Sequence, residues 1–100
     1  MDKNQVIEIA GRYAERVQGL FSTRSIVLYG SYAKGTARDD SDIDIAVIVD
    51  VLKTDYLDET ARLYKLRREF DDRIEPLLLE SGDDRSGFLQ EILRTGIRIA

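Results

Sequence analysis

Two periodicities of hydrophobic and polar positions run along this chain. From residue 3 to about residue 18, apolar residues recur every three or four positions, which predicts an amphipathic helix with Asp2 as its N-cap. The apolar positions are Val6, Ile9, Ala10, Tyr13, Val17 and Leu20. Gly19 is expected to end this helix with a positive φ. The apolar run that follows, from Ser25 to Tyr29, predicts a buried strand.

The best-defined element is a second strand, from Asp42 to Val49. Side chains two positions apart on a strand leave the same face of the sheet, so Asp42 and Asp44 share one face. The opposite face carries a core pattern of Ile43, Ile45, Val47 and Val49. Asp is disfavoured in strands, and two like charges on one face are costly without a cation. The pair therefore indicates a cation site, whereas Asp39 and Asp40 are interpreted as a solvated acidic turn.

A long helix is predicted from Lys53 to about Asp71, with Thr54 or Asp55 as its N-cap. Its broad apolar face is expected to contain Leu57, Ala61, Leu63, Tyr64, Leu66 and Phe70. Its basic residues fit the solvated side of a helix better than a nucleic-acid surface. These are Arg62, Lys65, Arg67 and Arg68.

The end of the chain contains a third strand and a last helix. The strand is predicted over Arg73 to Leu79. The helix is predicted from about Ser86 to Arg94, and Gly96 ends it. Its inward-facing residues are expected to be Phe88, Leu89, Ile92 and Leu93. The apolar tail 97–99 docks either on the sheet or on a partner.

The connections between strands predict the sheet. A helical crossover makes the second and third strands parallel, and the short first connection makes the first two antiparallel. Pro76 lacks an N–H group and fits an edge strand. We therefore expect one domain over residues 1–100, of the α/β (α+β) class. A small mixed three-stranded sheet in the order 1-2-3 packs against about four helices.

Parallel pairing of the second and third strands predicts where a third acid lies. Glu75, near the start of its strand, should lie beside Asp42 and Asp44. Asp72 and Glu80 are rivals for this role, but Asp72 is expected at the helix end and Glu80 at the wrong end of the strand.

A glycine- and serine-containing turn joins the first two strands. Gly30 and Ser31 open a short helical turn over residues 32–34, which offers backbone N–H groups and a hydroxyl to a phosphate. A plain connection between strands is the alternative interpretation. Mg²⁺ prefers carboxylate oxygens together with substrate phosphates. The turn and the acidic pair together predict a metal–phosphate site.

The spacing Gly30-Ser31, ten residues, then Asp42-x-Asp44 resembles the signature of the DNA polymerase β-like nucleotidyltransferase superfamily. The short chain is most similar to its minimal nucleotidyltransferase branch. The resemblance implies the nucleotidyltransferase fold and two Mg²⁺ ions held by Asp42, Asp44 and Glu75, with Glu75 also accepting a proton from the acceptor. It further implies that the triphosphate of ATP is bound by Gly30, Ser31, Lys34 and Ser41.

Minimal nucleotidyltransferases typically occur with a helical HEPN-domain protein. The resemblance therefore implies an antitoxin that transfers AMP from ATP to a tyrosine of a HEPN toxin, in a homo- or hetero-oligomer. A non-catalytic antitoxin that only binds its partner is one alternative. A small-molecule nucleotidyltransferase of the aminoglycoside type is another, disfavoured because 100 residues leave no room for a substrate domain.

Composition excludes several other classes of function. The chain is 43% hydrophobic and 34% charged, which is typical of a globular protein. It has no cysteine and no histidine, so thiol nucleophiles, disulfides and imidazole ligands are absent. A net charge of −4 without a basic stripe argues against direct nucleic-acid binding. No apolar run reaches ~18 residues and the N-terminus is no signal peptide, so a cytoplasmic protein without membrane association is expected.

Overall fold

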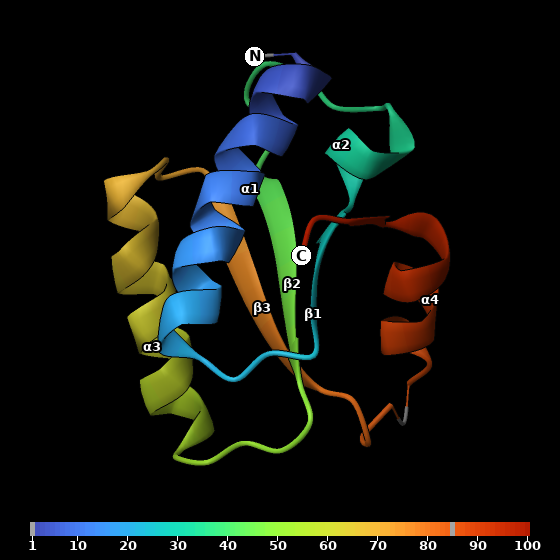
Figure 1. The fold of residues 1–100 in the computed structure, drawn as a ribbon. Helices are drawn as coiled ribbons and strands as arrows, with labels where there is room; N and C mark the ends of the chain where they lie inside the picture. The colour runs from blue at the N-terminus through green and yellow to red at the C-terminus, as the bar shows by residue number, and fades with distance from the viewer. Residues whose placement is uncertain (1, 85) are drawn as a thin grey trace.

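The sheet lies between two helices on one face and a third helix on the other in the computed structural model, which describes residues 2–84 and 86–100 (Figure 1). The strands are β1 (Ser25–Tyr29), β2 (Ile43–Val49), β3 (Ile74–Glu80) and β4 (Ile97–Arg98). The helices are α1 (Lys3–Leu20), α2 (Ser31–Lys34), α3 (Tyr56–Leu66) and α4 (Phe88–Thr95). Within the described residues, no helix has the length and apolar character needed to span a membrane.

The strand order is β3-β2-β1-β4. β2 pairs antiparallel with β1 and parallel with β3, so the predicted mixed sheet and the order of its first three strands are confirmed. Pro76 lies on an edge strand, as expected. The prediction of three strands is wrong, because the apolar tail pairs antiparallel with β1 as a fourth strand.

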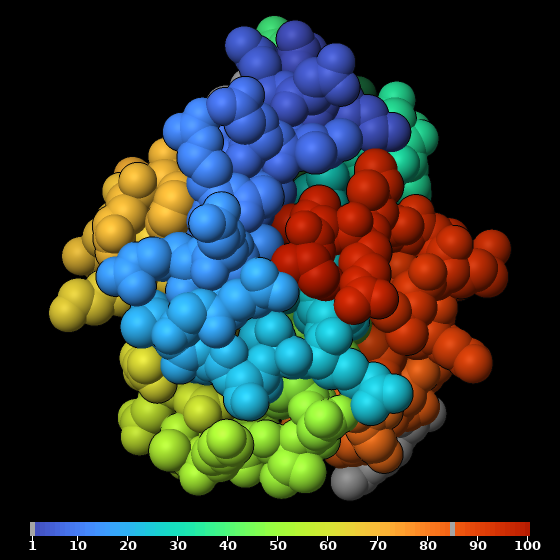
Figure 2. Space-filling model, viewed as in Figure 1, coloured from blue at the N-terminus to red at the C-terminus, as the bar shows by residue number. Residues whose placement is uncertain are grey.

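Backbone hydrogen bonds attach the tail to the free edge of β1. Ile26 N donates to Ala100 O at 2.9 Å, and Ile99 N donates to Ile26 O at 2.9 Å. Ile97, Ile99 and Ala100 also pack against the main core cluster. Figure 2 shows these C-terminal residues in red at the surface beside α1. The sequence left the docking of the tail open, and the free edge of β1 decides it.

Alternation along β2 divides the core into two layers. Ile43, Ile45, Val47 and Val49 are buried against α1 and α3, as predicted. On the other face, Ala46 and Ile48 pack with Leu89 and Ile92 of α4. Asp44 belongs to this second face, but at the end of the strand that α4 does not bury.

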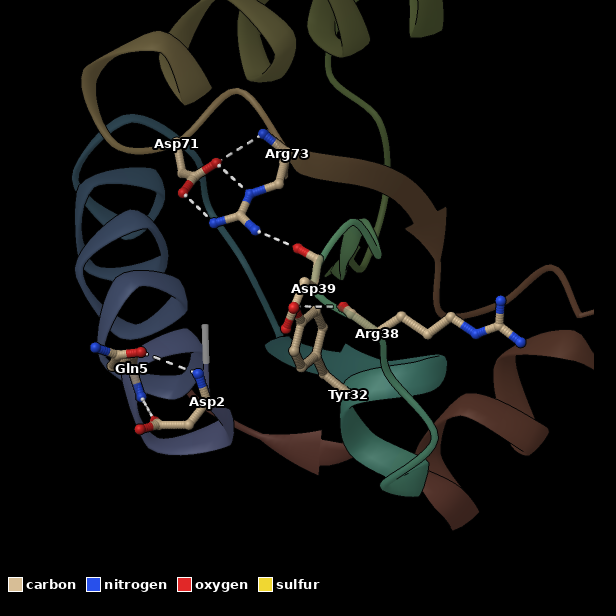
Figure 3. Close-up of polar contacts among 7 residues, drawn as sticks. All are labelled: Asp2, Gln5, Tyr32, Arg38, Asp39, Asp71 and Arg73. Carbon is tan, nitrogen blue, oxygen red and sulfur yellow. Dashed lines mark hydrogen bonds and ion pairs between the residues drawn. The ribbon is translucent and has the colours of Figure 1, made fainter.

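α1 begins at the predicted residue and ends later than predicted. Asp2 and Gln5 form a capping box, in which Gln5 N donates to Asp2 Oδ1 at 2.8 Å and Asp2 N donates to Gln5 Oε1 at 2.9 Å (Figure 3). The prediction that Gly19 ends the helix with a positive φ is wrong. The helix continues to Leu20, and Phe21, whose side chain is buried, donates its N–H to Val17 O.

α3 is shorter than predicted. Asp55 caps it by accepting from the N–H groups of Leu57 and Asp58. After Leu66 the chain turns into a 3₁₀ helix (Arg67–Glu69), so the expected helix to Asp71 is only partly correct. Leu63 and Leu66 are buried, whereas Leu57 is 73% exposed and does not belong to the apolar face.

The buried face of α4 contains fewer residues than predicted. Leu89 and Ile92 are buried, but Phe88 and Leu93 are about half exposed. Gly96 ends the helix, as expected. A Cβ at this position would lie 2.5 Å from Val27 Cγ1, 2.6 Å from Ile92 O and 2.8 Å from Leu28 O. The helix and β1 therefore meet at a point where only hydrogen fits.

Two Gly→Ala substitutions should act in opposite directions on stability. Gly96→Ala forces backbone atoms apart and should lower the free energy of unfolding by about 1–3 kcal/mol. Gly11→Ala, inside α1 with no atom within 4 Å of the added Cβ, should raise it by about 0.5–1 kcal/mol. Urea denaturation of both variants measures the difference. Equal stability of the two variants would contradict the packing described here.

Candidate active site

Asp44 stands at the centre of a row of polar side chains across three strands. In the sheet register it pairs with Tyr29 of β1 and with Glu75 of β3. Residues directly opposite on neighbouring strands share a face, so the three side chains lie together. Parallel pairing was predicted to bring Glu75 beside the acidic pair, and the register confirms this placement.

Two other carboxylates, those of Asp42 and Glu75, act electrostatically on Asp44. Asp42 lies exposed directly before β2, and Asp44 is half-buried. Burial, together with the negative charges of Asp42 and Glu75, raises the pKa of Asp44 to about 6. The acidic pair thus carries a repulsion that a cation would relieve.

Gly30 provides the backbone that packs against Asp44. It has a φ of +74°, and a Cβ there would lie 2.2 Å from Asp44 Oδ2. A glycine is required on both counts, because a side chain would be strained and would collide with the carboxylate. Ser31 follows as the first residue of α2, and Lys34 is its last residue and is exposed. Three of the predicted phosphate ligands, Gly30, Ser31 and Lys34, therefore lie on one short segment that begins beside Asp44.

The loop between α2 and β2 is fixed by contacts from two sides (Figure 3). Tyr32 Oη donates to Arg38 O at 3.3 Å. Arg73 Nη1 donates to Asp39 O at 3.1 Å, and Asp71 orients the same guanidinium through bonds of 3.1–3.2 Å to Nη2 and Nε. The segment before β3 therefore holds the segment before β2.

Ser41 closes the last turn of this loop. Its Oγ accepts from Arg38 N at 2.8 Å, and its own N–H donates to Arg38 O at 3.1 Å. The expectation that Ser41 braces the turn before Asp42 agrees with these bonds. Its expected contact with nucleotide stays a prediction.

Two residues that the sequence did not single out contact Glu75, one from α3 and one from the 3₁₀ helix that follows it. Tyr64 Oη donates to Glu75 Oε2 at 2.9 Å, and Arg67 Nη1 lies 3.6 Å from Glu75 Oε1. Tyr64 was expected only in an apolar face, and Arg67 only on a solvated one. No periodicity signals such contacts, because they depend on how α3 crosses the edge of the sheet.

The two rival acids are not level with Asp44. Asp72 is exposed before β3 begins, and Glu80 pairs with Val49 at the far end of β2. Among residues 2–84 and 86–100, no three acidic, histidine or cysteine side chains are grouped closely enough to hold a metal ion. The arrangement therefore offers Asp42 and Asp44 as a two-carboxylate site, with Glu75 beside it.

Tyr29 adds an aromatic side to the site. Its ring meets that of Phe88 edge to face, with centroids 6.0 Å apart. Burial raises the pKa of Tyr29 to about 12, and Asp44 contributes in the same direction. The phenol therefore stays protonated next to the acidic pair.

Residues 12–100 match the family described as polymerase beta nucleotidyltransferases. The chain belongs to this family. The resemblance found in the motif is thereby confirmed over most of the chain, with all the candidate site residues inside the match.

Two relatives in the family come from Methanocaldococcus jannaschii, and both are named as candidate protein adenylyltransferases. One is 34% identical over 89 residues, which cover 83% of this chain and 60% of the relative. The other is 23% identical over 101 residues, which cover 95% of this chain and 99% of the relative. The chain thus spans three fifths of the first relative's length and nearly all of the second's.

Solved structures share the nucleotidyltransferase fold. A candidate nucleotidyltransferase from Sulfolobus solfataricus matches with a TM-score of 0.69 and 20% identity, over 96% of this chain and 80% of that one. A toxin–antitoxin structure with AMP-PNP matches with a TM-score of 0.65 and 22% identity, over 100% of this chain and 73% of that one. A mutant of the toxin–antitoxin MntA-HpeT matches with a TM-score of 0.57 and 18% identity, with the same coverage.

The raised pKa of Asp44 should make stability depend on pH. Its pKa is about 6 in the folded chain and about 3.9 when unfolded, so the folded state binds more protons between these values. The free energy of unfolding should therefore fall as pH rises from about 4 to about 6, relative to Asp44→Asn. Urea denaturation without divalent cations measures this difference. Parallel pH profiles of wild type and Asp44→Asn would contradict it, and Asp40→Asn should follow wild type.

Proposed function

We propose that this protein transfers AMP from ATP to a tyrosine hydroxyl of a partner protein, and that the partner is a HEPN-domain toxin that this modification silences. The observation that carries the proposal is Asp44, which feels the charge of Asp42 and lies directly against Gly30 at the start of the Gly30–Ser31 turn. The names of the two Methanocaldococcus relatives support protein adenylylation. The matched toxin–antitoxin structures, one of them with AMP-PNP, support a toxin partner and a nucleotide substrate.

Asp42 and Asp44 would hold Mg²⁺. The donor set fits this ion, because both groups are carboxylates and Mg²⁺ is typically held by one or two of them plus substrate phosphates. Burial and the negative charges of Asp42 and Glu75 raise the pKa of Asp44, and a bound cation would offset the repulsion among these charges. Bound there, Mg²⁺ supplies charge neutralisation to the triphosphate and to the departing pyrophosphate.

The segment beside Asp44 would hold the triphosphate. Gly30 lets the backbone approach without a side chain, Ser31 offers a hydroxyl, and Lys34 offers a positive charge. Lys34 acts as a point charge, without the planar fork of an arginine. The bonds that fix the loop through Ser41 would keep these groups at a constant distance from the acidic pair.

Glu75 would take the proton of the acceptor. A bond then forms between the acceptor oxygen and the α-phosphorus of ATP, and the bond from that phosphorus to the pyrophosphate oxygen breaks. A carboxylate suits this step in a chain without histidine. Glu75 is the acid level with Asp44, so it is placed beside the phosphate that the pair would hold.

Asp44→Asn should remove transfer and leave the fold intact. The substitution removes a negative charge from the site. It should not destabilise the fold, because that charge is repelled by Asp42 and Glu75. Co-expression with a HEPN-domain candidate partner, followed by intact mass measurement, should show the mass of AMP added to the partner by wild type. The rate should fall at least about 100-fold in the variant.

The matched control is Asp40→Asn, which changes an exposed acidic residue in the loop before β2 and should transfer at the wild-type rate. Transfer by Asp44→Asn within about twofold of wild type would refute the catalytic role. If the variant instead protects cells from the partner without adding mass, the protein is a non-catalytic antitoxin.

Mg²⁺ with ATP should raise the melting temperature of wild type. A ligand that binds only the folded state stabilises it by about 2.7 kcal/mol at ~100 times its Kd. The double variant Asp42→Asn/Asp44→Asn should lose this response, because it lacks both carboxylates. Differential scanning fluorimetry with a non-hydrolysable ATP analogue measures it. An equal response of both proteins would place the nucleotide elsewhere.

A further inference from the structure

The carboxylate of Glu75 has contacts at both of its oxygens. Tyr64 Oη donates to Oε2 at 2.9 Å, and the guanidinium of Arg67 lies 3.6 Å from Oε1. Tyr64 and Arg67 are three residues apart, so they project from the same side of the helical segment. By contrast, the carboxylates of Asp42 and Asp44 have no side-chain hydrogen bonds within the described residues.

The two residues that contact Glu75 are themselves fixed. Arg67 Nη1 donates to Ile74 O at 2.9 Å, and its guanidinium lies over the Tyr64 ring at 4.8 Å from the centroid. The preceding residue, Leu63, is fully buried, and its carbonyl accepts from Tyr13 Oη at 2.8 Å. The last turn of α3 and the start of the 3₁₀ helix therefore hold Tyr64 and Arg67 in a defined position at the edge of β3.

These contacts matter because an unsupported glutamate would be mobile. The Glu75 side chain is 41% exposed on an edge strand, and ordering such a chain costs conformational entropy. Its negative charge also adds to the repulsion at Asp44. Arg67 offsets that charge, and Tyr64 fixes the plane of the carboxylate. A carboxylate has about four acceptor positions, so two remain for an incoming hydroxyl.

We propose that Tyr64 and Arg67 are positioning residues that orient Glu75 toward the acceptor hydroxyl. This inference rests on the proposed function, because it assigns the support of the proton acceptor in the same reaction.

The test is a double-mutant cycle between Tyr64→Phe and Glu75→Gln. Tyr64→Phe keeps the ring under Arg67 and removes only the hydroxyl. It should lower kcat for AMP transfer about 10-fold or more and change KM for ATP less than about twofold, since the triphosphate is held elsewhere. In the Glu75→Gln background, Tyr64→Phe should have no further effect, because the residue acts through Glu75.

Tyr56→Phe is the matched control, since Tyr56 is a partly exposed tyrosine of the same helix without a contact to Glu75. It should leave kcat unchanged. Arg67→Lys should lower kcat like Tyr64→Phe, while Arg68→Lys should not. Calorimetric titration with Mg²⁺ and a non-hydrolysable ATP analogue should give the same affinity for wild type and Tyr64→Phe.

Two outcomes would overturn the inference alone. One is wild-type kcat in Tyr64→Phe, and the other is an equal drop with and without Glu75, which would indicate a general structural role. Failure of wild type to transfer AMP to any HEPN-domain partner would instead overturn the proposed function, and this inference with it. The three results are distinguishable in one set of rate measurements.

Discussion

The rest of this site depends on the negative charge that Asp44 places on one face of β2. Asp44 is half-buried and flanked by two other carboxylates, so its ionised form is disfavoured in the folded protein. The sheet register fixes it there, because β2 is paired on both sides. Gly30 gives it room, and Arg67 offsets the charge of Glu75 beside it. The sheet register and Gly30 act directly on Asp44, and Arg67 acts on it through the charge of Glu75.

The same strand stabilises the fold. The face of β2 opposite Asp44 is buried against α1 and α3, so displacing the strand to relieve the repulsion would expose the core. The ends of β2 and β3 nearest the site are also linked, because Arg73 binds the loop that precedes Asp42. The apolar core thus holds the carboxylates in place. Their repulsion lowers the free energy of unfolding of the domain, and the burial of the core offsets this loss.

Much of the sheet and of the placement of the acidic residues could be predicted from the local pattern of apolar and polar positions. The alternation in β2 determined which face carries Asp44, and the helical crossover determined that Glu75 lies level with it. Both follow from the period of a strand and from chain connectivity. The contacts of Tyr64 and Arg67 could not be predicted, because they depend on the angle at which α3 crosses β3. The fourth strand was also missed, since a short apolar tail carries no signal for the edge it joins.

Both edges of the sheet resist the addition of another strand. At one edge β4 has only two residues, and at the other β3 contains Pro76, which has no N–H group to donate. The edge at β4 is therefore short, and Pro76 interrupts the row of N–H donors along β3. A strand added to β3 would lack a main-chain hydrogen bond at Pro76, so both edges favour contacts through side chains and loops over pairing with a further strand.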